Sequence, residues 1–216
     1  MSIKFVSLFP AHLDLNGDQG NLKVMQKRLE WAGHKSVLES VEKGQPIPVD
    51  ADFIFIGHGS KAAWSDIDEA LVAIKPQLIE MISNGVGFMA VASGYERSIQ
   101  MGIFEGNLES TDRSSKFEIQ QLTDFEVLGY LNAATSAPVV QKIELKLGTQ
   151  LHGPFFAKNP DLVDAYLGEI LSRKSATSSK PSNVSLDPLP ELKHNAGRVA
   201  DIVKAVWELE KNLASE

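Results

Sequence analysis

The chain has 216 residues, 43% of them hydrophobic and 23% charged, which is the composition of a globular protein able to bury a core. Its formal net charge of −7 argues against an extended basic surface for nucleic acid or anionic lipid. No window reaches the roughly 20 consecutive apolar residues that span a bilayer, and the first residues lack a signal-peptide pattern, so we expect a cytoplasmic protein without a membrane span. The sequence contains no cysteine, which excludes disulfides, thiolate metal sites and a cysteine nucleophile.

The first hundred residues alternate between strand-like and helix-like patterns. Strands are expected at residues 3–9, 34–41, 52–56 and 86–91. Helices are expected at residues 21–32 and 96–101. A further helix is expected between them, with a cap at Asp66, a stop at residues 84–85, and Pro76 as a kink or break. The β-α-β-α-β order predicts a mostly parallel sheet covered by helices on both faces. Ligands of such sheets bind beyond the carboxyl ends of the strands.

The second half of the sequence is less regular. Short β-like pieces occur at residues 117–119, 125–130 and 139–147, and a helix is expected at 160–171. We expect residues 1–172 to form one domain, residues 173–190 to form a flexible linker rich in Ser, Pro and Lys, and residues 191–216 to form a C-terminal helix. That helix carries an apolar stripe that must cover its own domain or a partner: Val199, Ile202, Val203, Val206, Leu209 and Leu213.

A polar loop follows the first strand and carries several groups that could serve a site. It combines glycines for tight backbone turns with carboxylate and carboxamide side chains: Asp14, Asn16, Gly17, Asp18 and Asn21. The simpler interpretation is that Asp18 or Asn21 caps the following helix.

Two further loops follow buried strands. In Gly57-His58-Gly59 the glycines allow backbone N–H groups to point at a developing negative charge, although a single loop histidine is more often solvated than catalytic. Residues 92–94 form the sharp strand-to-helix turn where α/β enzymes place a nucleophile, and Ser93 is the obvious candidate. The serine-hydrolase elbow has glycines two residues before and two after the serine, and this chain lacks both.

Taken together, four segments resemble the class I glutamine amidotransferases of the cobyric acid synthase type, most closely the glutaminase subunits of lipid II isoglutaminyl synthases. The segments are residues 13–21, 53–60, 90–96, and 148–154 with 158–160. The first and the last are the most specific, since each resembles a family motif over eight or more positions. The resemblance covers most of the chain and implies a three-layer α/β/α, flavodoxin-like fold.

The resemblance also implies roles for particular residues. In that family a cysteine at the elbow attacks the side-chain amide of glutamine, a histidine activates the thiol, backbone N–H groups hold the oxyanion, and the ammonia passes to a ligase partner. By position the nucleophile falls on Ala92 and the histidine on His152. The substrate-binding positions fall on Gly57, His58, Gly59, Ser93, Tyr95 and Glu96.

Several of these positions depart from the family pattern. Ala92 replaces the cysteine, Ser93 a glycine and Glu96 a glutamine, and residues 132–136 replace an Asn-His-Gly-Gly-Arg segment. We therefore expect an amidotransferase-like subunit without glutaminase activity, a Mur-ligase-type partner in peptidoglycan precursor amidation, and a pocket for glutamine or a related small molecule. No cofactor or metal is expected. Two alternatives stay open: an active amidotransferase whose natural residue 92 is cysteine, and a hydrolase that uses Ser93 with His152.

Overall fold

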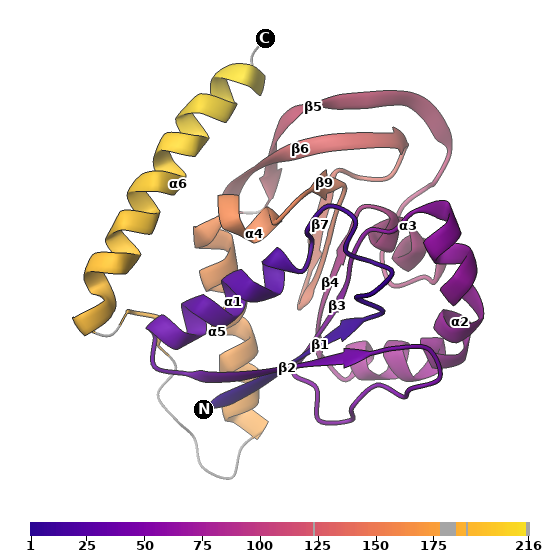
Figure 1. Cartoon of the computed structure of the whole chain (residues 1–216), viewed down its shortest axis with the longest axis horizontal. Helices are drawn as coiled ribbons and strands as arrows, with labels where there is room; N and C mark the ends of the chain where they lie inside the picture. Colours follow the sequence, from indigo (N-terminus) through magenta and orange to yellow (C-terminus); the bar gives the residue numbers. More distant parts are fainter. Residues whose placement is uncertain (123, 178–184, 189, 215–216) are drawn as a thin grey trace.

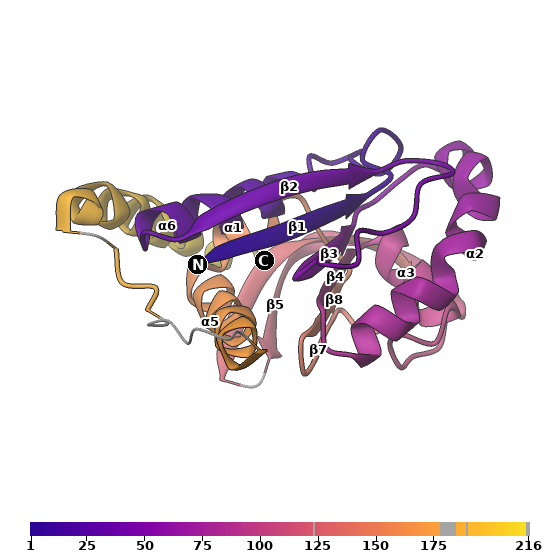
Figure 2. The same cartoon turned by 90° about the horizontal axis from the view of Figure 1, so that it is seen from below.

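A computed structural model of the chain describes residues 1–122, 124–177, 185–188 and 190–214, except the side chains of residues 191 and 194. Its central sheet has the strand order β2-β1-β3-β4-β8-β7, in which only β7 runs antiparallel to its neighbour (Figures 1 and 2). The strands are β1 Ser2–Leu8, β2 Lys35–Val41, β3 Phe53–Ile56, β4 Gly87–Val91, β7 Val140–Ile143 and β8 Lys146–Thr149. The predicted α/β class and mostly parallel sheet are thus confirmed.

Helices cover both faces of this sheet (Figure 2). On one face lie α1 Gly20–Trp31 and α5 Pro160–Thr177, and on the other lie α2 Lys61–Ser83 and α3 Ser93–Gln100. All four residues of β3 and all five of β4 are buried, because apolar side chains on both faces of these strands enter one of the two cores.

Helix α2 differs from the prediction at its start and in its middle. Its N-cap is Ser60, whose Oγ accepts a hydrogen bond from the amide of Ala63 at 3.1 Å, and Asp66 lies inside the helix. The helix continues through Pro76, which is exposed. Proline removes the hydrogen bond to the carbonyl of Val72, and this costs little here because solvent can hydrate that carbonyl.

A second sheet, with strand order β5-β6-β9, is built around a long antiparallel hairpin. Its strands are β5 Ser110–Leu122, β6 Phe125–Thr135 and β9 Leu151–His152. Only fragments of it were predicted, because most residues of β5 are exposed or half-buried and carry no clear apolar alternation. The hairpin arches over the carboxyl-end edge of the central sheet (Figure 1).

The C-terminal part is more helical than expected. Helix α5 continues to Thr177, so the first residues of the expected linker 173–190 are helical; Lys174 contacts the carboxylate of Asp52 and ties this last turn to the sheet. Residues 178–184 and 189 lie outside the described part. A short helix α4 (Phe155–Lys158), a 3-10 turn (Pro190–Leu192) and α6 (Lys193–Ala214) complete the chain.

Helix α6 packs on α4 and β5 at one edge of the molecule. The indole N–H of Trp207 donates to the carbonyl of Lys158, whose Nζ lies 2.7 and 2.8 Å from the carboxylate oxygens of Glu210. Within the described residues, no helix has the length and apolar character needed to cross a membrane.

Candidate functional site

The connection between β4 and α3 is a strained elbow centred on Ala92. This residue has φ 49° and ψ −117°, a backbone conformation that L-residues rarely adopt. Its amide donates to the carbonyl of Thr149 at 2.7 Å, while its own carbonyl accepts from the amide of Glu96 at 3.0 Å and begins α3. Enzymes use this backbone geometry to present a nucleophilic side chain, but the methyl group of Ala92 cannot act as a nucleophile.

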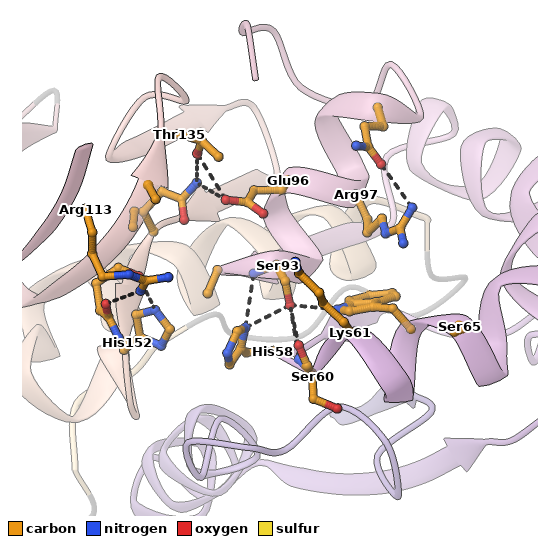
Figure 3. A pocket seen from close by; sticks show the side chains of 18 of the residues that line it. His58, Ser60, Lys61, Ser65, Ser93, Glu96, Arg97, Arg113, Thr135 and His152 are labelled. Atoms are coloured by element: carbon orange, nitrogen blue, oxygen red, sulfur yellow. Dashed lines mark hydrogen bonds between the residues drawn. The ribbon is translucent and has the colours of Figure 1, made fainter. Parts of the chain in front are cut away.

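A cavity of about 840 Å³ opens at this elbow (Figure 3). Its wall comes from the loops after β3, β4 and β8, the first turns of α2 and α3, and the hairpin β5-β6. It includes six residues singled out from the sequence: His58, Gly59, Ala92, Ser93, Glu96 and His152. It also includes residues that were not singled out, because only the tertiary structure brings them there: Lys61, Trp64, Asp68, Arg97, Arg113 and Gln150. The segment 132–136, which differs from the family pattern, contributes residues 132–135 to the same wall.

The hydroxyl of Ser93 is held in a compact network. Its Oγ accepts hydrogen bonds from the amide of Gly59 at 3.1 Å and from Nε1 of Trp64 at 2.7 Å, and it lies 2.8 Å from Nδ1 of His58. Because a hydroxyl oxygen has two acceptor lone pairs, the two N–H donors occupy both. Ser93 is therefore poorly placed to attack a substrate.

The same contacts fill the backbone donors that could hold an oxyanion. The amide of Gly59 donates to Ser93 Oγ, and the amide of Ser93 donates to Nδ1 of His58 at 3.3 Å. The amide of His58 donates to the carboxylate of Asp18 at 2.9 Å. Each of these three N–H groups thus already has an acceptor from the protein itself.

The two histidines of the cavity stack edge to face, with ring centroids 4.9 Å apart. Nε2 of His152 donates to the carbonyl of Asn132 at 3.1 Å, so its Nδ1 is the acceptor that faces the amide of Asn16. His152 and Ser93 consequently have different hydrogen-bond partners, and the histidine beside Ser93 is His58 rather than His152, which the hydrolase alternative would require.

Burial keeps both rings uncharged near neutral pH. It lowers the pKa of His58 to about 4, with the nearby His152 adding to the effect. Burial likewise lowers the pKa of His152, while the carbonyl of Asn132 acts in the opposite direction. A neutral histidine can accept a proton, but the ring nitrogens of His152 contact an amide and a carbonyl, and His58 faces the hydroxyl of Ser93, whose oxygen already accepts two N–H groups.

The polar loop at residues 14–21 supports the site more than it lines it. Asn16 reaches His152, whereas Asp14 accepts from the amide of Gln19 at 2.9 Å and turns the loop. Asn21 accepts from the amide of Phe156 at 2.9 Å and so fixes α1 to the start of α4. Gly17 provides a turn with φ 73°.

Asp18 of this loop is fully buried beneath the Gly57-His58-Gly59 turn. Its Oδ2 accepts from the amide of His58, and its Oδ1 has no hydrogen-bond partner in the described part of the chain. Burial raises the pKa of this carboxyl to about 6, although the hydrogen bond from His58 favours the charged form.

Two residues expected to contact substrate lie behind the cavity wall instead. Tyr95 is fully buried, and its ring packs edge to face on Phe104 at 5.1 Å and against Gly148. Ser93 and Glu96 are three residues apart and share the face of α3 that lines the cavity, whereas Tyr95 lies on another face and enters the core. A Cβ at Gly57 would lie 2.2 Å from the carbonyl oxygen of Leu13, so this glycine allows a close backbone approach.

Charged groups surround the cavity. Glu96 accepts from the hydroxyl of Thr135 at 3.0 Å and from the amide of Gln150 at 3.3 Å. Arg113 of the hairpin donates to the side chain of Asn132 at 2.6 Å. Within the residues that the structure describes, no group of three or more His, Asp or Glu side chains could hold a metal ion.

No family model matches the chain, and no curated protein matches it either. Among solved structures, a chain titled "Structure of PurLQS from Thermotoga maritima" superposes with a TM-score of 0.50 at 13% sequence identity, covering 81% of this chain and 100% of that one. A glutamine amidotransferase (tm1158) from Thermotoga maritima gives a TM-score of 0.49 at 12% identity over 94% of both chains. A protein titled SMU.1228c gives 0.47 at 12% identity over 94% of this chain and 100% of that one.

At these identities the first likeness establishes the fold and nothing finer. Together with the strand order of the central sheet, it shows a three-layer, flavodoxin-like α/β fold.

Proposed function

We propose that this chain is a glutamine amidotransferase-like subunit that has lost the glutaminase step. We further propose that it acts as a binding or scaffold subunit for a Mur-ligase-type partner in the amidation of peptidoglycan precursors, and that it belongs with the cobyric acid synthase type. The fold supports the broad class. The finer assignment rests on the resemblance of the four sequence segments given above.

The elbow at Ala92 is the observation that carries the loss of activity. The backbone keeps the strained conformation that presents a nucleophile, yet the side chain there is a methyl group, which cannot attack a carbonyl carbon. Removing the nucleophile of a nucleophile-base unit costs several orders of magnitude in rate. Strain of this kind persists only where the surrounding structure imposes it, which is consistent with a site derived from a catalytic ancestor.

A second feature supports the same conclusion independently. The hydroxyl of Ser93 and Nδ1 of His58 accept the N–H groups of Gly59 and Ser93, which are the donors that would stabilise an oxyanion beside residue 92. Loss of one such donor typically costs 10²- to 10³-fold in turnover. Inactivity would therefore persist even if a thiol were present.

The cavity remains open, and glutamine or a related small molecule is the ligand that the resemblance favours. A pocket of this size, with a few converging polar groups, is typical of small-molecule sites. Binding of such a ligand does not need the missing nucleophile. The proposed binding or scaffold role needs no cofactor.

Ammonia release from L-glutamine tests the loss of activity. We expect the purified chain and its His152→Ala variant to release ammonia at the same background rate. Release by the unaltered chain that exceeds the His152→Ala rate would refute the proposal. The gene sequence decides the alternative of an active enzyme, since a cysteine codon at position 92 would show that the alanine was introduced.

A serine-directed fluorophosphonate probe tests the hydrolase alternative. Since both lone pairs of Ser93 Oγ accept hydrogen bonds, we expect no labelling. For the partner, we expect a Mur-ligase-type protein encoded nearby to co-migrate with this chain on size exclusion at micromolar concentration, and separate migration would count against a scaffold role.

A further inference from the structure

An apolar groove lies between α1 and α6, away from the cavity at Ala92. It has a volume of about 480 Å³ and runs beside the short helix α4. Its apolar lining consists of Val24, Trp31, Phe156, Ala157, Pro160, Val199 and Val203. No residue of the Ala92 cavity lines it, so its use is independent of the proposed function.

Helix α6 extends this apolar surface onto its outer face. The apolar residues Val199, Ile202, Val206, Leu209 and Leu213 follow one another at alternating spacings of 3 and 4 residues. Ile202 is 58% exposed and Leu209 is 65% exposed, although α6 is anchored to the domain through Trp207 and Glu210. Alternating 3 and 4 spacing is the pattern by which one helix packs alongside another.

The rim of this surface is basic, in contrast to the net charge of −7 of the whole chain. Lys23 and Lys27 lie on the α1 side of the groove, and the exposed Arg198 precedes Val199 on α6. Lys27 pairs with Glu30 of its own helix at 2.8 Å. Among the described residues, Lys23 and Arg198 have no carboxylate partner.

We propose that this surface, the α1–α6 groove, docks an amphipathic helix of another protein that carries acidic side chains beside its apolar stripe. The apolar stripe of the partner would remove Ile202 and Leu209 from water, which is the main favourable term in such association. Its acidic side chains would meet Lys23 and Arg198, which sets the orientation and rejects basic helices. A second copy of α6 fits less well, because its own stripe is flanked by Arg198.

Two labelled synthetic helices of about three heptads provide the probes. Both carry leucine at positions a and d, one with glutamate and the other with lysine at positions e and g. Fluorescence anisotropy with the full chain should show at least tenfold tighter binding of the glutamate peptide. Ile202→Glu should weaken that binding at least tenfold, whereas Val72→Glu, at a 68% exposed position on α2, should leave it unchanged.

A charge reversal tests the electrostatic part. The double variant Lys23→Glu with Arg198→Glu should reverse the order of the two peptides, and circular dichroism should show that every variant keeps its fold. The proposal would be overturned if the glutamate peptide showed no binding, if the charge reversal left the preference unreversed, or if Val72→Glu weakened binding as much as Ile202→Glu. So would sedimentation showing that the chain dimerises and that Ile202→Glu abolishes the dimer, since the surface would then serve a second copy.

Discussion

The hydroxyl oxygen of Ser93 lies 3.1 Å from the amide nitrogen of Gly59 and accepts its hydrogen bond. The side chain of Ser93, the first residue of α3, thereby occupies a backbone donor that the proposed function would assign to the oxyanion. Under the proposed function, the site differs from an active glutaminase both in the nucleophile and in the hydrogen-bond donors around it, and the two differences can be separated by mutation.

Restoring the thiol alone should not restore activity. We expect Ala92→Cys to release ammonia from glutamine at close to background, because the amides of Gly59 and Ser93 remain occupied. Adding Ser93→Gly frees the amide of Gly59, and the double variant should exceed the single one by about 10²-fold. A steady-state ammonia assay measures both. High activity of Ala92→Cys alone would show that Ser93 does not block the site.

Replacing Asp18 by asparagine should stabilise the protein above pH 6. The folded protein raises the pKa of this carboxyl from 3.8 to about 6, so burial of the charged form lowers stability as pH rises through that interval. The side-chain carbonyl in the Asp18→Asn variant can still accept from the amide of His58, and it carries no charge. We expect a gain of about 1 to 2 kcal/mol at pH 8 that disappears below pH 4, measured by urea unfolding.

His58 should give the opposite pH dependence. Its folded pKa of about 4 is lower than the ordinary 6.5, so the unfolded chain binds a proton before the folded chain does, and stability falls as pH drops from 6.5 toward 4. In the unaltered chain, Asp18 opposes this effect, because protonation of its buried carboxyl adds stability as pH falls; the Asp18→Asn variant removes that contribution. Its unfolding free energy should therefore decrease more steeply with acidification across this interval than that of the unaltered chain. Equal slopes would contradict the assigned pKa directions.

Two glycine-to-alanine substitutions should have opposite effects. A Cβ at Gly94 would lie 2.5 Å from the carbonyl oxygen of Gly57, so Gly94→Ala must push α3 away from the loop after β3. We expect a loss of about 1 to 3 kcal/mol. Gly197 lies inside α6 with open space around it, and Gly197→Ala should raise stability by about 0.5 to 1 kcal/mol. Thermal or denaturant unfolding compares both variants with the unaltered chain.

The attachment of α6 should depend on Trp207. Its indole N–H donates to the carbonyl of Lys158, and Glu210 one turn later pairs with the Nζ of the same residue. We expect Trp207→Ala to accelerate amide hydrogen exchange throughout α6 while the strands of the central sheet keep their protection. Leu209→Ala, at an exposed position of the same helix, is the matched control and should leave the exchange of α6 nearly unchanged.

The sequence by itself determined the class of the fold and the edge of the sheet at which the candidate site lies. Apolar runs such as residues 53–56 and 87–91 predict strands buried on both faces, and a β-α-β order makes them parallel. The carboxyl ends of parallel strands meet at one edge of a sheet. The loops at His58 and Ala92 were therefore expected at the same edge, whereas only the family resemblance added His152; all three line one cavity.

Only the tertiary structure decided how these residues interact. Which histidine faces Ser93 depends on loop geometry that periodicity does not specify, and the structure places His58 there, not the His152 of the hydrolase alternative. The full length of the hairpin that brings Arg113 to the cavity was not predicted, because most residues of β5 are exposed or half-buried and lack apolar alternation. The division of the α6 stripe into a packed side and an exposed side likewise depends on where Trp207 and Glu210 meet the domain, which local pattern cannot specify.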